Sequence, residues 1–236
     1  ASSDYRHFNN FRRNPIYNDI LEHVSEELGE KYLRVINRDP DILRAICKFK
    51  LNDAYGNPRM YDYPNIGMIS PTTLRYIKVL ADLKQYFLSL DNLNICEIGT
   101  GYGGQCRIIN AYCNPNTYCL VDIQPALALT QRYLDNYSLN SVLAYKTMNE
   151  LHRECYDLVI SNYAFSELRR SVQDVYLKKI ILQSKRGYLT YNEITPNDFD
   201  SYKPNDLAAL IPGSKILKET PLTHPNNCLI IWGQSS

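Results

Sequence analysis

A glycine-rich segment, with a carboxylate further along the chain, gives this sequence its strongest chemical signal. Residues 97–104 read EIGTGYGG directly after a short apolar run, and Asp122 closes the next apolar run. Glycines allow a tight turn and let a ligand approach the backbone, and a carboxylate at the neighbouring strand end accepts hydrogen bonds from both hydroxyls of a ribose. These residues predict a nucleotide-binding crevice at the ends of two adjacent strands.

Gly99, Gly101 and Gly104 also satisfy the G-x-G-x-x-G fingerprint of dinucleotide-binding folds, so a nicotinamide-dependent oxidoreductase is one alternative. Three features disfavour it. Glu97 is expected to point into the site, where it would repel a pyrophosphate but suit a cationic sulfonium and an α-amino group. No sizeable second domain follows the sheet, and the last two apolar runs suggest a reversed strand pair that a dinucleotide fold does not need.

Apolar runs of strand length alternate with helical segments from residue 94 onward, which is typical of a parallel sheet covered by helices on both faces. We therefore expect a Rossmann-like, doubly wound α/β fold with a mostly parallel seven-stranded sheet and an antiparallel C-terminal strand. The expected strands cover residues 94–99, 117–123, 141–146, 156–164, 186–192, 214–220 and 227–233. The expected helices between them cover residues 101–113, 124–137 and 171–183.

The chain before the sheet reads as helical and irregular, so we divide it into a helical cover, residues 1–92, and a sheet domain, residues 93–236. Apolar residues recur at helical spacing across residues 14–36. Asp39 and Ser70 are expected N-caps, because a proline follows each of them at the first helical position.

Residues 54–70 hold two glycines, two prolines and three tyrosines, which predicts a loop. A loop of this length inside a compact chain is usually functional. We expect Tyr55, Tyr61 and Tyr63 to act as a lid that stacks on a ligand ring and excludes water. The alternative is that these rings only pack the helices onto the sheet. Arg75, in the helix that follows, is expected to meet a carboxylate or to form a surface ion pair.

Composition narrows the class of protein. The 236 residues are 44% hydrophobic and 22% charged, which fits a globular protein and excludes disorder, and no apolar run reaches the ~18 residues of a membrane span. The net charge of +1 lacks the basic excess of a nucleic-acid binder. Seven cysteines without metal-site spacing indicate a reducing, cytoplasmic location and no zinc framework.

The motif EIGTGYGG (97–104) followed by LVDI (120–123) resembles the first two motifs of class I S-adenosylmethionine-dependent methyltransferases. Further segments resemble the putative sugar O-methyltransferases of bacterial surface-polysaccharide loci. These are ISPTTLRYIKVLADL (69–83), DLVISNYAFSEL (157–168), SKRGYLTYN (184–192) and CLIIWG (228–233). The narrower resemblance extends over nearly the whole chain, the N-terminal helices included.

This resemblance implies S-adenosylmethionine as the cofactor. Glu97 would hold the methionine amino group or shape its pocket, Asp122 would bind the ribose hydroxyls, and Ile123 would lie against the adenine. The loop at 147–149 would flank the adenine, where the usual acid is not evident, although Glu150 is close. The cofactor-binding residues it implies are Glu97, Gly99, Gly101, Tyr102, Gly103, Asp122, Ile123, Met148 and Ser161.

In the methyltransferase fold the end of the fourth strand faces the methyl group. Here Asn162 and Tyr163 are placed to orient an acceptor, and Glu167 is the first candidate for the base that a sugar hydroxyl needs. Glu167 also suits a helix cap, since a helix is expected just after it. His224 is the second candidate base, although a lone histidine in a loop rich in proline and asparagine is more often solvated.

The sequence thus predicts an enzyme that moves a methyl group from S-adenosylmethionine to a hydroxyl of a sugar or sugar nucleotide, a small-molecule or glycan substrate. No paired acids or His-x-His set requires a metal, and we expect no nucleic-acid partner and no membrane span. A homodimer remains open. The alternatives are methylation of another small-molecule hydroxyl or amine, the oxidoreductase, and a non-catalytic cofactor-binding subunit.

Overall fold

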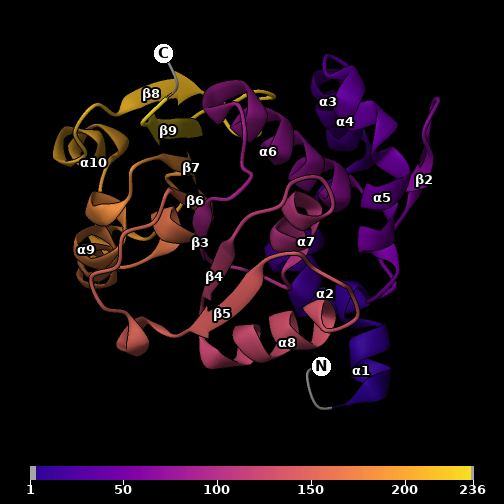
Figure 1. Ribbon diagram of the computed structural model, residues 1–236, viewed down its shortest axis with the longest axis horizontal. Coiled ribbons are helices and arrows are strands. Elements are labelled where there is room, and N and C mark those ends of the chain that lie inside the picture. The colour runs from indigo at the N-terminus through magenta and orange to yellow at the C-terminus, as the bar shows by residue number, and fades with distance from the viewer. Residues whose placement is uncertain (1–3, 235–236) are drawn as a thin grey trace.

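Seven strands form one sheet in the order β5-β4-β3-β6-β7-β9-β8 (Figure 1). β9 is antiparallel to the other six strands. The computed structural model describes residues 4–234. The strands are β3 (Asn94–Ile98), β4 (Thr117–Val121), β5 (Val142–Lys146), β6 (Leu158–Asn162), β7 (Gly187–Tyr191), β8 (Lys215–Lys218) and β9 (Cys228–Trp232). The predicted α/β sheet with one reversed C-terminal strand is confirmed.

Helices cover both faces of the sheet (Figure 1). α6, α7 and α8 share one apolar core with the N-terminal helices, and α9 and α10 bury the other face. The helices are α1 (Tyr5–Asn9), α2 (Pro15–Tyr17), α3 (Glu26–Ile36), α4 (Pro40–Arg44), α5 (Ile46–Lys50), α6 (Pro71–Phe87), α7 (Gly104–Asn110), α8 (Gln124–Leu134), α9 (Arg170–Lys179) and α10 (Pro204–Leu210). Helix α10 has no counterpart among the elements expected from the sequence.

The strand order reverses at β3, and this is where a doubly wound sheet opens its ligand crevice. β3 lies between β4 and β6, both parallel to it, and Ile98 pairs with Val121 in the β3–β4 register. The residues that follow these two, Gly99 and Asp122, therefore leave the sheet side by side.

Both N-caps expected from the sequence are present. One carboxylate oxygen of Asp39 accepts the backbone N–H groups of Asp41 and Ile42, at 3.0 and 3.2 Å, at the start of α4. The Ser70 hydroxyl accepts the backbone N–H of Thr73 at 3.1 Å at the start of α6. Each cap satisfies amide groups that the first helical turn leaves without partners.

Two other expectations for the N-terminal part are wrong. The helical pattern of residues 14–36 breaks at 23–25, where the Ser25 side chain caps α3 instead of continuing the preceding turn. The expected loop at 54–70 contains a β-hairpin, β1 (Tyr61–Tyr63) and β2 (Gly67–Ile69). Short capping side chains and three-residue strands leave too weak a periodic signal for the sequence to show them.

The rings expected to form a lid pack into the protein instead. Tyr63 is buried and its hydroxyl donates to the backbone carbonyl of Glu26 at 3.1 Å. Tyr55 packs edge-on against Tyr133 and Tyr137, and Tyr61 lies partly buried against the same core. Tyr55 thus attaches the cover to α8 of the sheet domain, and Tyr63 attaches the hairpin to α3 within the cover.

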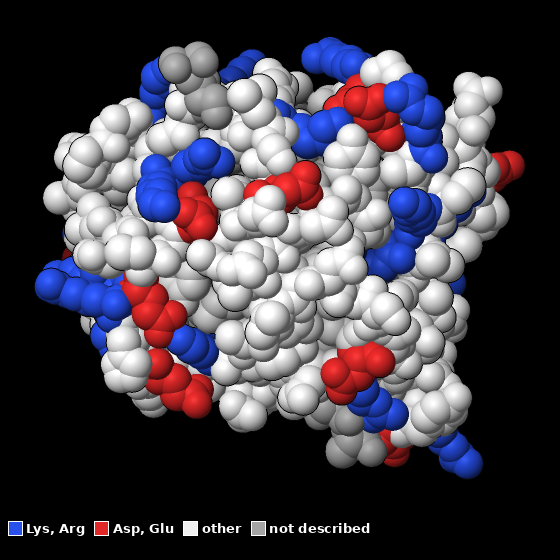
Figure 2. Space-filling view, in the orientation of Figure 1, with Lys and Arg blue, Asp and Glu red and all other residues white. Residues whose placement is uncertain are grey.

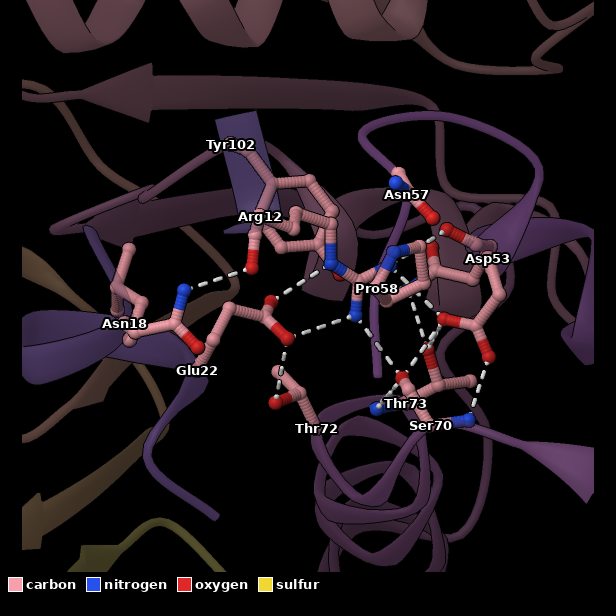
Figure 3. A network of polar contacts seen from close by, with 12 residues as sticks. Arg12, Asn18, Glu22, Asp53, Asn57, Pro58, Ser70, Thr72, Thr73 and Tyr102 are labelled. Atoms are coloured by element: carbon pink, nitrogen blue, oxygen red, sulfur yellow. Dashed lines mark hydrogen bonds and ion pairs between the residues drawn. The ribbon is translucent and has the colours of Figure 1, made fainter. Parts of the chain in front are cut away.

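A buried ion cluster holds the N-terminal cover, residues 4–92, together (Figure 3). The Arg12 guanidinium is fully buried and donates to the Glu22 carboxylate at 2.7 and 3.2 Å, to Asp53 at 2.8 Å and to the Ser70 hydroxyl at 2.9 Å. Its guanidinium also lies 4.9 Å from the ring centre of Tyr102, in the glycine-rich segment. One cation therefore joins three parts of the cover to the sheet domain.

Removing this cation should destabilise the protein strongly. Arg12→Ala leaves two carboxylates buried without a counter-ion, at 5% and 4% side-chain exposure, which should cost about 3–5 kcal/mol of unfolding free energy in urea titrations. Arg34→Ala breaks an exposed pair with Glu30 and should cost less than about 1 kcal/mol. Equal losses in the two variants would contradict the role given to Arg12.

The surface carries mixed charge. On the face in Figure 2, acidic and basic side chains alternate around the rim and the centre is uncharged. Within residues 4–234, no helix combines the length and the apolar character needed to cross a membrane. All seven cysteines are free thiols.

Candidate active site

The loop between β3 and α7 needs glycine for its shape. Gly99, Gly101 and Gly103 have φ of +81°, +57° and +91°, a region that side chains with a Cβ rarely adopt. A Cβ on Gly99 would lie 2.0 Å from the Cβ of Ala164, so this glycine lets the loops after β3 and β6 touch. A Cβ on Gly101 would lie 3.0 Å from the Leu21 side chain, so the cover lies directly on the loop.

Asp122 lies beside this loop in a fixed orientation. One of its carboxylate oxygens accepts the backbone N–H of Thr100 at 2.8 Å, and the other accepts that of Ile123 at 2.7 Å. Burial raises the pKa of Asp122, and these backbone hydrogen bonds oppose the rise. The first oxygen also accepts the Thr100 hydroxyl at 3.4 Å, and the second keeps a lone pair for another donor, so a half-buried acceptor lies beside the loop.

Glu97 lies beneath the loop rather than open to the crevice. Its side chain is buried, and its carboxyl accepts the Tyr118 hydroxyl at 2.7 Å. Burial raises the pKa of Glu97 from its ordinary value of 4.5 to about 8, against the effect of the Tyr118 hydrogen bond. At neutral pH the folded protein therefore holds a protonated carboxyl that a nearby cation would ionise.

This buried carboxyl should give the protein a measurable pH dependence. The unfolded chain loses the Glu97 proton near pH 4.5 and the folded chain near pH 8, so the free energy of unfolding falls as pH rises between these values. Glutamine stays neutral, so Glu97→Gln should gain stability relative to wild type from about pH 5 to about pH 9. Urea midpoints across that range measure this, and parallel curves would show that Glu97 is already ionised at low pH.

The other predicted cofactor residues divide between the crevice and the interior. Ile123 is exposed beside Asp122, and Met148 is half-buried after β5, the strand next to β4. The Ser161 hydroxyl donates to the carbonyl of Ile98 at 2.8 Å and so ties β6 to β3. Tyr102 is fully buried and accepts a hydrogen bond from Asn52 of the cover at 3.0 Å.

Gly103 and Glu150, which the sequence placed near the cofactor, make contacts within the protein instead. The space above Gly103 is filled by Thr130 and Leu134 of α8, so this glycine serves helix packing. Glu150 closes a capping box, because its carboxylate accepts the Thr147 backbone N–H and hydroxyl, each at 2.7 Å.

Of the four predicted catalytic residues, Asn162 and Tyr163 lie at the crevice end of β6. Glu167 is exposed and accepts the Asn192 side-chain amide at 2.7 Å, and α9 begins only at Arg170, so Glu167 does not cap that helix. His224 is exposed in the loop between β8 and β9. Both predicted bases are therefore exposed to solvent.

A buried carboxylate that sequence reasoning did not select lies beside Tyr163. Glu219 follows β8, is 5% exposed and accepts a short hydrogen bond from the Tyr163 hydroxyl. Its other oxygen accepts the backbone N–H of Thr223 at 2.9 Å and the Thr223 hydroxyl at 2.6 Å. The only signal in the sequence was its position next to a strand end, which many exposed glutamates share.

A small cavity of about 10 Å³ adjoins this pair. Its polar lining includes Arg75, whose Nε is buried and has no hydrogen-bond partner within residues 4–234. The cavity is lined by Tyr32, Arg75, Lys78, Val79, Asn162, Tyr163, Tyr188, Thr190 and Glu219. Residues from α3, from α6 and from the carboxyl ends of β6 and β7 therefore line the same cavity.

A larger cleft of about 640 Å³ lies between α1, α2 and α8. Arg6, His7, Arg13 and Tyr17 line it, and none of the residues predicted as site residues does. The buried Tyr17 hydroxyl has no hydrogen-bond partner among the described residues. Burial raises the pKa of Tyr17 well above its usual range. Among residues 4–234 there is no group of three or more histidine, cysteine or acidic side chains that could hold a metal ion.

No protein-family model and no curated protein matches the sequence. The structure resembles that of magnesium protoporphyrin IX methyltransferase from Synechocystis PCC 6803 with bound SAH (TM-score 0.51, 15% identity, 68% of this chain and 82% of that one). It also resembles the PH0226 protein from Pyrococcus horikoshii OT3 (TM-score 0.53, 10% identity, 68% and 90%). The chain therefore has the fold of the class I methyltransferases.

Proposed function

We propose that the protein is an S-adenosylmethionine-dependent O-methyltransferase that acts on a hydroxyl of a sugar or sugar nucleotide. The arrangement of the glycine loop after β3 and Asp122 after β4, at the point where the strand order reverses, carries the proposal. The reversed β9 between β7 and β8 also belongs to this fold and is not needed by a dinucleotide-binding fold. Residues 1–92 serve as its acceptor-side cover and residues 93–236 as its catalytic domain.

The residues present fit the cofactor. The half-buried Asp122 carboxylate suits ribose hydroxyls, and the exposed side chain of Ile123 next to it suits the face of an adenine. The positive φ of Gly99 and Gly101 gives the loop the tight turn along which the methionine part would lie. Glu97, protonated when alone, ionises beside the cationic amino and sulfonium groups and then holds them by charge.

The chemistry divides between cofactor and protein. S-adenosylmethionine supplies a methyl carbon on a positively charged sulfur, which is a good leaving group. The chain must hold an acceptor hydroxyl in line with that bond, exclude water and accept the hydroxyl proton. Asn162 and Tyr163 at the end of β6 orient the hydroxyl, and the cover, which rests on Gly101 through Leu21, keeps water out.

The motifs shared with sugar O-methyltransferases support a sugar acceptor.

Cofactor choice is tested by calorimetry. We expect S-adenosylhomocysteine to bind and NAD not to bind. Asp122→Asn should weaken S-adenosylhomocysteine binding by about 1–3 kcal/mol, because it removes charged hydrogen bonds to the ribose. Asp135→Asn changes an exposed carboxylate at the other end of α8 and should leave the affinity unchanged. Binding of NAD alone would sink the proposal, and equal affinities in the two variants would remove Asp122 from the site.

Acceptor choice is tested with methyl-tritiated S-adenosylmethionine and a mixture of UDP-, GDP- and dTDP-hexoses. We expect label in the nucleotide-sugar fraction. Label that appears only with other small alcohols or amines would keep the methyltransferase and remove the sugar. Cofactor binding without any transfer would indicate a non-catalytic subunit.

A further inference from the structure

We propose that Tyr163 and Glu219 form a proton relay, in which the acceptor hydroxyl gives its proton to Tyr163 while Tyr163 gives its own to Glu219. The inference rests on the proposed methyl transfer and names its base, which neither the sequence motifs nor the similar structures identify. Its starting point is the geometry of these two side chains.

Tyr163 is held in a backbone conformation that costs energy. It directly follows β6 with φ +67° and ψ −31°, which is rare for a bulky side chain. The surroundings enforce this conformation. Its N–H donates to the Thr190 carbonyl at 2.9 Å, and its own carbonyl accepts the Ser166 hydroxyl at 2.6 Å. Strain kept by such contacts at the crevice end of a strand is typical of a residue placed for function.

Glu219 is a buried carboxylate that only hydrogen bonds satisfy. Tyr163 and Thr223 donate to it, and Thr223 is in turn held by the Asn227 side chain at 2.7 Å. Among the ion pairs of residues 4–234, none includes Glu219. Glu219 is therefore a buried acceptor whose partners are two hydroxyl groups and one backbone N–H.

The cavity beside the pair is about the size of a single oxygen. Its volume of about 10 Å³ suits one water molecule or one hydroxyl group. Arg75 and Asn162 lie on its other sides, and the unpartnered Nε of Arg75 can steady the incoming oxygen. The titratable and charged groups around the relay are Tyr32 from α3, Arg75, Lys78 and Asp82 from α6, Tyr188 from β7 and Cys228 from β9.

The acceptor oxygen forms a bond to the methyl carbon, the carbon–sulfur bond breaks, and its electron pair stays on the sulfur, which becomes neutral. The acceptor proton moves to the Tyr163 oxygen as the Tyr163 proton moves to the Glu219 carboxylate. Burial and the Glu219 charge raise the pKa of Tyr163 well above its usual range, so Tyr163 stays protonated before and after transfer. Glu219 releases its proton when the product leaves.

The chain contains a matched pair for comparison. At the opposite end of the same strand, the Tyr156 hydroxyl donates to Glu154 at 2.6 Å, but Glu154 is partly exposed and pairs with Lys146. Tyr156 and Glu154 have the same residue types and the same kind of hydrogen bond as Tyr163 and Glu219, but they do not lie at the crevice. Their variants therefore control for the loss of a tyrosine hydroxyl or a carboxylate as such.

The test compares Tyr163→Phe and Glu219→Gln with Tyr156→Phe and Glu154→Gln, using the tritium-transfer assay with the nucleotide-hexose mixture. We expect the first two variants to lose about 10²–10⁴-fold in kcat, with the KM for S-adenosylmethionine and the affinity for S-adenosylhomocysteine unchanged. The two control variants should stay within about threefold of wild type. The double variant Tyr163→Phe/Glu219→Gln should be about as slow as the slower single variant, because both residues serve one proton path.

Full activity of Tyr163→Phe, or independent losses that multiply in the double variant, would overturn the relay and leave the methyltransferase proposal intact. A wild-type protein that binds S-adenosylhomocysteine but transfers no label to any acceptor would overturn both. Circular dichroism checks folding, and Tyr163→Phe, which removes one oxygen atom, decides alone if Glu219→Gln does not fold.

Discussion

The buried guanidinium of Arg12 is the interaction on which the rest of this structure depends. It joins residues from the N-terminal helices, the turn before the hairpin and the start of α6, and it lies against Tyr102 in the glycine-rich segment (Figure 3). A buried ion cluster of this kind adds little net stability compared with an apolar core, but breaking it leaves costly unpaired charge. Its effect is therefore to fix where the cover sits relative to the crevice.

The sequence predicted most of the sheet, the glycine loop and two helix caps. Strand runs, the glycine loop, Asp122 and the caps at Asp39 and Ser70 depend on local chemistry, which a single sequence displays directly. Glu219 could not be found in this way. It lies 56 residues from Tyr163 and meets it only because the loop after β8 returns across the end of the sheet. His224, in that same loop, attracted attention by its residue type, yet the fold leaves it in solvent.

The abundance of tyrosine has a structural explanation that composition alone did not supply. Several tyrosines are fully buried and still satisfy their hydroxyls inside the protein, as Tyr133 does with Asn52 and Tyr188 with Asp82. A ring of this kind buries a large apolar area and at the same time pairs a polar atom of a neighbouring element. In this chain tyrosine mainly joins the cover and the helices to the sheet, and Tyr163 is the one we assign to chemistry.

The contact between Leu21 and Gly101 has a kinetic consequence. Because this side chain of the cover lies over the loop, a ligand placed along the loop would have to displace Leu21 before it could contact Gly101. Under the proposed function, the rate of that displacement would limit how fast the ligand exchanges. Substitutions that hold the cover more firmly would raise the free energy of unfolding and slow ligand exchange at the same time. The same few residues would therefore set both the stability of the protein and the rate of exchange.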